Sequence, residues 1–233
     1  MSVPHDAWIA DVVMHDDRMV SAGTDGVIKI TDLSGEEIAV LREQPNHSLN
    51  AVALSPDARL LAAATVNERA IGRVRVWDVG TRGIVRTIDD AAETVAFTAD
   101  GIRLVTAGAD GVHVWDVRSW ERTAAFEGHA GQVFAAALAP DGATVATAGT
   151  DGAVRLWDPA NGNERLTLHG HEQGVTDIAF SADGTKLVTG GLDGVARVWA
   201  LDLEDLIAIA EDKLTRGFTE AECREYLRRD ACP

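Results

Sequence analysis

The strongest constraint on the fold is a pattern that occurs twice late in the chain, over residues 128–157 and residues 170–199. Each copy starts with Gly-His, passes through an Asp-Gly pair and ends in a Trp, and corresponding positions lie 42 residues apart. The segments that lead to Trp157 and Trp199 alternate between apolar and charged residues. A period of two is typical of β-strands, and Asp-Gly accommodates the positive φ of tight hairpin turns. The pattern therefore predicts short strands joined by tight turns.

The same pattern recurs less completely upstream, which gives five repeats. The closing position is occupied in chain order by Thr31, Trp77, Trp115, Trp157 and Trp199. A repeat of about forty residues that holds four short strands is typical of a β-propeller blade. We therefore predict an all-β fold in which residues 1–200 form a propeller of five four-stranded blades. The blades are expected to start near residues 5, 47, 89, 129 and 171.

The Gly-His start, the Asp-Gly turn and the closing Trp-Asp resemble those of the WD-repeat family, over nearly all of residues 5–200. The resemblance implies that the His, Ser/Thr, Asp and Trp of each blade form a structural hydrogen-bond chain. The chemistry is suitable, because Trp only donates, hydroxyl and imidazole can donate and accept, and carboxylate only accepts. By position these residues are His5, Ser21 and Asp25; His47 and Trp77; Thr106, Asp110 and Trp115; His129, Thr147, Asp151 and Trp157; and His171, Thr189, Asp193 and Trp199. A catalytic set occurs once, whereas this set recurs in several repeats, so a structural role is favoured over catalysis.

Three of the repeats depart from the pattern. The first has Thr31 at the position of the Trp, and the second has Ala63 at the position of the hydroxyl. In the second, residues 66–72 also replace the short Asp-Gly turn, which we interpret as a tolerated insertion rather than a contact element. The third repeat has Asp89-Asp90 where Gly-His is expected.

The family resemblance also implies a top face that contacts partners. It is made by the loops that lead into each innermost strand and by the turn before each Asp-Gly. By position its residues are Asp6, Trp8, Thr24, Ser48, Ala109, Gln132, Thr150, Glu172, Gly174 and Leu192. Trp8 has two interpretations of equal weight: an exposed Trp is a typical interface anchor, but this one can also pack against a neighbouring blade.

The alternation of strand residues stops after Trp199. Apolar residues then recur at helical spacing, and a capping-box pattern follows, at Leu203, Leu206, Ile207, Ala210 and Leu214 and at Thr219 with Glu222. We predict a short α-helical tail over residues 201–233. Its sequence resembles the terminal segment that follows the WD repeats of large bacterial signalling proteins.

The fifth blade is expected to lack an outer strand, because no strand is predicted after Trp199 and only four residues precede His5. Three interpretations stay open. The chain is the C-terminal part of a longer propeller with blades upstream, it closes by pairing with another chain, or it forms a five-bladed ring capped by the tail. An open arc exposes strand edges and apolar blade faces, which favours a homo-oligomer.

Composition limits the classes of partner. The net charge of −16 weighs against nucleic acid, and the sequence has neither a membrane-length apolar run nor a signal peptide. Cys223 and Cys232 lie in the tail without metal-ligand spacing, and common catalytic motifs are absent. We expect a cytoplasmic protein without metal or cofactor.

These observations together predict a non-enzymatic scaffold or sensory module that binds a protein partner, as part of a bacterial signalling protein. One alternative is an enzyme or small-ligand binder that uses the central channel. Another is a propeller half that associates with itself.

Overall fold

The computed structural model describes residues 5–15, 17–43, 47–67, 72–109 and 111–202, together with residue 207. Its strands, in chain order, are β1 (Ile9–His15), β2 (Arg18–Gly23), β3 (Val27–Asp32), β4 (Glu37–Arg42), β5 (His47–Leu54), β6 (Leu60–Asn67), β7 (Gly72–Asp78), β8 (Gly83–Ile88), β9 (Ala92–Phe97), β10 (Arg103–Gly108), β11 (Gly111–Asp116), β12 (Arg122–Phe126), β13 (Val133–Leu138), β14 (Val145–Gly149), β15 (Val154–Trp157), β16 (Glu164–Leu168), β17 (Val175–Phe180), β18 (Lys186–Gly191) and β19 (Ala196–Ala200).

Sequence-adjacent strands pair antiparallel and form five separate sheets. We number these as blades: blade 1 is β1–β4, blade 2 is β5–β8, blade 3 is β9–β12, blade 4 is β13–β16 and blade 5 is β17–β19. The all-β prediction is confirmed. The prediction of four strands holds for blades 1 to 4, whereas blade 5 has three strands within the described residues. The predicted helical tail falls on residues 201–233, nearly all of which, with both cysteines, lie outside the described part of the chain.

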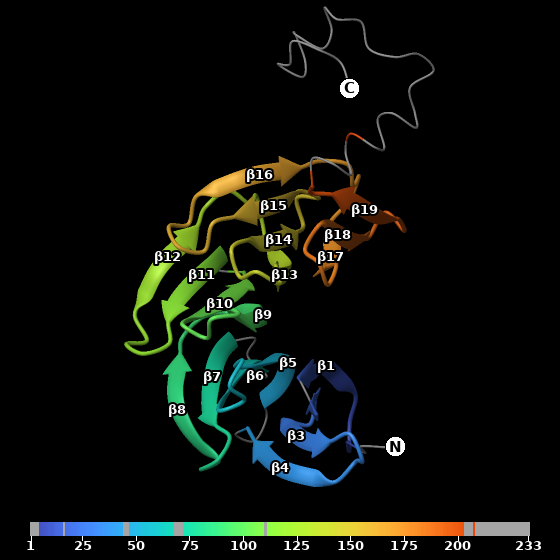
Figure 1. Cartoon of the computed structure of the whole chain (residues 1–233). Helices are drawn as coiled ribbons and strands as arrows, with labels where there is room; N and C mark the ends of the chain where they lie inside the picture. The colour runs from blue at the N-terminus through green and yellow to red at the C-terminus, as the bar shows by residue number, and fades with distance from the viewer. Residues whose placement is uncertain are drawn as a thin grey trace, which may run out of the picture.

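The first strands of neighbouring blades, β1, β5, β9, β13 and β17, lie side by side. The blades thus follow one another along an arc, with blade 1 and blade 5 at its two ends (Figure 1). The described part of the chain does not close into a ring.

The hydrophobic core lies between blades rather than within one of them. Four apolar clusters each join two consecutive blades, so that Val20 and Ile30 of blade 1 pack with Leu49 and Val52 of blade 2. Because a sheet exposes two faces, each inner blade needs a neighbour on both sides to bury its apolar residues.

Tight turns end the hairpins where Asp-Gly pairs predict them. Gly26, Gly152 and Gly194 adopt φ values of 75°, 72° and 76°, as expected for glycine in such turns. Blade 2 differs, because its ladder continues to the pairs Val66 with Gly72 and His47 with Asn67. The long segment that replaces its Asp-Gly turn therefore extends the β-ribbon.

Candidate functional site

A hydrogen-bond chain crosses blade 4 from its third strand to the turn before that strand. Trp157 Nε1 donates to Thr147 Oγ1 at 2.7 Å, this oxygen lies 2.8 Å from His129 Nε2, and His129 Nδ1 lies 3.0 Å from Asp151. Because indole only donates and carboxylate only accepts, the hydroxyl donates to Nε2 and the Nδ1–H donates to Asp151. Every member is therefore satisfied, which makes this buried polar network stabilising.

Blade 5 repeats the arrangement. Trp199 Nε1 donates to Thr189 Oγ1 at 3.0 Å, this oxygen lies 2.8 Å from His171 Nε2, and His171 Nδ1 lies 3.0 Å from Asp193. Thr189 and the His171 side chain are almost fully buried.

Blade 1 keeps the chain but lacks its Trp. His5 Nε2 lies 2.8 Å from Ser21 Oγ, and His5 Nδ1 lies 3.5 Å from Asp25. Thr31, at the position of the Trp, is buried, and its hydroxyl has no hydrogen-bond partner among the described residues.

The three network carboxylates have a lowered pKa. Burial acts in the opposite direction and would raise the pKa of Asp25, Asp151 and Asp193. Hydrogen bonds from backbone N–H groups and from the partner His outweigh it, because they stabilise the ionised form. In blade 4 one of these N–H groups belongs to Ala130, which follows the network His. In blades 1, 4 and 5 the carboxylate thus ties the loop before the first strand to the turn before the third strand.

Blade 3 replaces the His with Asp90. The Thr106 hydroxyl donates to Asp90, Trp115 Nε1 donates to Thr106 Oγ1 at 3.0 Å, and His113 Nδ1 lies 3.1 Å from Asp90. The predicted member Asp110 lies outside the described residues. The family pattern missed Asp90 and His113 because neither occupies a motif position, although Asp89-Asp90 at the Gly-His position was a signal.

Blade 2 lacks this chain, and an ion pair instead joins its Arg75 to Glu43, which follows the last strand of blade 1. Arg75 Nε lies 3.1 Å from Glu43 Oε1, and both side chains are almost fully buried. Ala63 supplies no hydroxyl, and Trp77 is buried in the cluster between blades 1 and 2. His47 lies within β5, opposite Asn67, two residues before Leu49. It therefore does not occupy the position of His129, which lies four residues before the equivalent Val133.

The structure brings six of the predicted top-face residues together in three pairs, and it pairs a seventh, Ala109, with Ala91, which was not predicted. The backbone N–H of the turn residue donates to the carbonyl of the residue that leads into the first strand: Thr24 to Trp8 at 2.8 Å, Ala109 to Ala91 at 3.2 Å, Thr150 to Gln132 at 2.9 Å and Leu192 to Gly174 at 2.8 Å. Ser48 instead pairs with Val66 inside the longer ladder of blade 2. Asp6 and Glu172 bind the network carboxylates through their backbone N–H groups. The Trp8 side chain is 86% exposed.

A polar chain crosses three blades beside this face. Glu93 of blade 3 accepts from the Asn50 amide of blade 2 at 3.0 Å and from the Gln132 amide before blade 4 at 2.9 Å. Asn50 and Glu93 both occupy the bulge of a first strand, one position after the bulge begins. Of these residues the pattern predicted only Gln132, because bulges are not visible in a single sequence.

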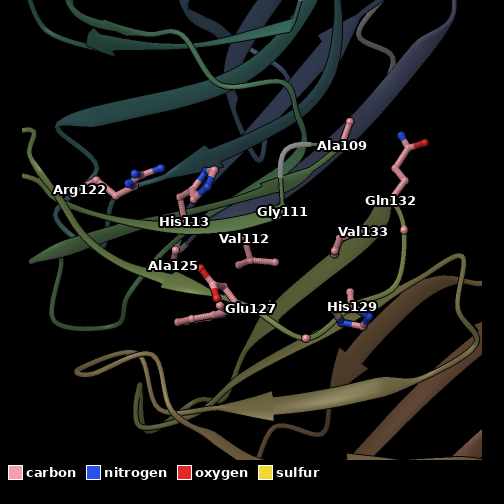
Figure 2. Close-up of a pocket in the computed structure, with 13 residues that line it drawn as sticks. Ala109, Gly111, Val112, His113, Arg122, Ala125, Glu127, His129, Gln132 and Val133 are labelled. Carbon is pink, nitrogen blue, oxygen red and sulfur yellow. The ribbon is translucent and has the colours of Figure 1, made fainter.

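A groove of about 630 Å³ lies between blades 3 and 4 next to Gln132. Figure 2 shows Ala109 and Gln132 on one side of it, with His113, Arg122, Glu127 and His129 along its length. Both imidazoles are engaged in blade networks, at Asp90 and Asp151. Within the described residues no group of His, Cys, Asp and Glu side chains is arranged to hold a metal ion. Polar side chains, including the guanidinium of Arg122, line the groove.

Comparisons with known proteins agree with these repeats. The family model described as "WD domain, G-beta repeat" matches residues 120–158 and 162–200. Each matched segment joins the outer strand of one blade to the first three strands of the next, and these two segments are similar to WD repeats.

Several relatives match over about half of the chain or more, and three of them are described here. They are Pre-mRNA-processing factor 19 homolog 2 of Arabidopsis thaliana, 32% identical over 49% of this chain and 22% of its own length; Small ribosomal subunit protein RACK1y of Oryza sativa subsp. japonica, 27% identical over 65% and 48%; and APC/C activator protein CDH1 of Saccharomyces cerevisiae, 25% identical over 60% and 25%. The chain thus spans less than half the length of each relative.

Proposed function

We propose that the chain is a non-catalytic scaffold that binds a protein partner on its top face. The observation that carries this proposal is the pairing of turn and lead-in residues at one end of blades 1, 3, 4 and 5. Rigid blades hold these loops in fixed positions, which lowers the entropic cost of binding. The WD repeats of blades 4 and 5 support it, because proteins built from such repeats generally act as protein-interaction scaffolds.

The groove between blades 3 and 4 gives the partner a concave contact. Gln132 lies at its mouth and is held by Glu93, so its side chain is oriented before a partner binds. Trp8 supplies an exposed aromatic anchor at the blade 1 end of the arc. A protein segment with polar side chains suits this surface better than a purely apolar one.

We expect the scaffold to work in the cytoplasm within a signalling protein. The bacterial origin inferred from the tail is not supported by the relatives described above, which are eukaryotic. Among the described residues there is no helix long and apolar enough to cross a membrane.

The proposal is tested by affinity capture with a matched pair of variants. Gln132→Arg combined with Thr150→Arg places bulk and charge on the top face, whereas Ala160→Arg adds an Arg to the exposed turn between β15 and β16, at the opposite end of blade 4. Bound proteins from an extract of the source organism are quantified by mass spectrometry. We expect specific partners to be lost from the double variant and retained by Ala160→Arg. Retention by both, or loss from both with intact folding, would contradict the proposal.

A further inference from the structure

Each blade has a trailing face, defined here as the face that packs on the next blade in chain order. Two positions mark it, on the second and third strands of every blade. On blades 1 to 4 these are Val20 and Ile30, Ala62 and Val76, Val105 and Val114, and Ala146 and Leu156, and all eight are buried. The trailing face of a blade is therefore an apolar surface that a following blade covers.

The trailing face of blade 5 is exposed within the described residues. Val188 and Val198, at the two marker positions, are 43% and 66% exposed. A Cβ added to Gly190 meets nothing within 4 Å, whereas the corresponding Ala22 and Ala148 are buried. The trailing face of blade 5 is thus as apolar as the faces that pack between blades, but among the described residues no following blade covers it.

A carboxylate on the same blade indicates what kind of chain fits there. In blade 1, Asp11 Oδ1 accepts from the Val12 N–H at 2.8 Å, and its Oδ2 accepts at 2.9 Å from the N–H of Val52, on the first strand of blade 2. Asp177 occupies the same position in blade 5, and its Oδ1 accepts from the Ile178 N–H at 2.8 Å. No described residue donates to its Oδ2, so the oxygen that bonds to the next blade in blade 1 has no such donor in blade 5.

We propose that the trailing face of blade 5 binds the first strand of a WD-type blade from another polypeptide. The matching strand has a small uncharged residue followed by an apolar residue whose backbone N–H can donate to a neighbouring blade, as Ala51 and Val52 do in blade 2. This N–H donates to Asp177 Oδ2, while the apolar side chains cover Val188 and Val198. The surface is separate from the top face, so this inference goes beyond the scaffold function proposed above.

A second copy of the chain is a poor match for this face. Its exposed first strand is β1, which would place Asp11 opposite Asp177 with like charge. The Val12 N–H that would have to donate is already bonded to Asp11. Charge complementarity therefore favours a blade of different sequence.

The test extends the full chain with a further blade and measures access to the face. In a background of Cys223→Ser and Cys232→Ser, Val198→Cys places one thiol on the trailing face of blade 5. A copy of blade 2, residues 43–90, follows Pro233 through a flexible linker, which raises its local concentration. We expect labelling of the thiol by a soluble reagent to slow at least about tenfold.

The matched control carries Asp in place of Ala51 within the appended copy, and this chain is expected to label as fast as the unextended one. A copy of blade 4, residues 127–169, provides a second uncharged strand in case the first does not fold. Fast labelling of both uncharged extensions, or equal protection by the Asp version, would overturn the proposal.

The unextended chain excludes other occupants. Slow labelling that depends on protein concentration would show that a second copy covers the face. Slow labelling at every concentration would show that residues 203–233 of the same chain do so. Either result would overturn the proposal.

Discussion

At the scale of single residues, polar side chains hold the blades together, and the residues that do so differ from blade to blade. Blades 4 and 5 use the full Trp, Thr, His and Asp set. Blade 3 exchanges the His for Asp90 and recruits His113, and blade 2 uses the pair of Arg75 and Glu43. In blades 3 to 5 each buried donor faces a buried acceptor, because an unsatisfied polar group in the core costs about 1–3 kcal/mol.

Trp157→Phe tests the network of blade 4. Phe keeps the stacking of the ring on Phe126 but removes the N–H that donates to Thr147. We expect the free energy of unfolding, measured in urea, to fall by about 1–3 kcal/mol. Trp77→Phe is the control, because Ala63 offers no hydroxyl to that Trp, and its loss should be smaller. Equal losses would show that the network contributes nothing beyond packing.

Thr31→Val tests the unpartnered hydroxyl of blade 1. Because the buried hydroxyl has no partner among the described residues, its removal should leave the free energy of unfolding unchanged or raise it by up to about 1 kcal/mol. Thr147→Val, which removes two hydrogen bonds, should lower it. Chemical denaturation of both variants measures the two free energies of unfolding. A similar decrease in each would contradict the conclusion that the Thr31 hydroxyl has no partner in the described part of the chain.

At the scale of elements, close approaches between turns and first strands fix the geometry of each blade. A Cβ added to Gly149 would lie 2.2 Å from the carbonyl oxygen of Gln132, so the hairpin can approach the lead-in loop only without a side chain. Blade 2 has Thr65 at this position, and there the strands continue as a ladder instead of closing in a tight turn.

Gly149→Ala and Gly190→Ala compare two glycines on second strands, of which only Gly190 has space for a Cβ. We expect Gly149→Ala to lower the free energy of unfolding by about 1–3 kcal/mol, because the backbone must shift. The Cβ added by Gly190→Ala meets no atom within 4 Å, and the substitution restricts the backbone of the unfolded chain. The free energy of unfolding should therefore stay unchanged or rise by up to about 1 kcal/mol. Thermal unfolding of both proteins is the measurement, and the reverse order would refute this explanation.

The turn between β17 and β18 should make stability depend on pH. The Ser181 hydroxyl, followed by the N–H and hydroxyl of Thr185, lowers the pKa of Asp183 to about 2. A lowered folded-state pKa stabilises the fold above the ordinary value of 3.8 and loses this effect as the pH falls towards 2. The free energy of unfolding in urea should therefore fall less steeply between pH 5 and pH 2 in Ser181→Ala than in the parent chain. An unchanged pH profile would contradict the role of this hydroxyl.

The strands and turns of this fold could be predicted because they depend on local patterns. Alternation, Asp-Gly pairs and closing Trp residues recur in sequence, so five blades were expected, as were only three strands for blade 5 among the described residues. The chain of Asn50, Glu93 and Gln132 and the pair of Arg75 and Glu43 could not be predicted, because each joins different blades. His47 was aligned by residue type, whereas the bulge of β5 sets its true position.

At the scale of the whole molecule, the blades form a row in which each depends on its neighbours. Blades 2 to 4 are covered on both faces, whereas blade 1 exposes Val12 and Met14 and blade 5 exposes Val188 and Val198. In such arrays stability comes largely from interfaces between neighbouring units, so the end units should open first. The open arc therefore predicts a gradient of stability along the chain.

Hydrogen exchange of backbone amides, followed by mass spectrometry under native conditions, measures this gradient directly. The open arc predicts the slowest exchange in β9 and β10 of blade 3 and faster exchange in β1 and β17–β19, with blades 2 and 4 between them. Equal protection of all five first strands would contradict it, because that result requires blades 1 and 5 to be covered as fully as the blades between them.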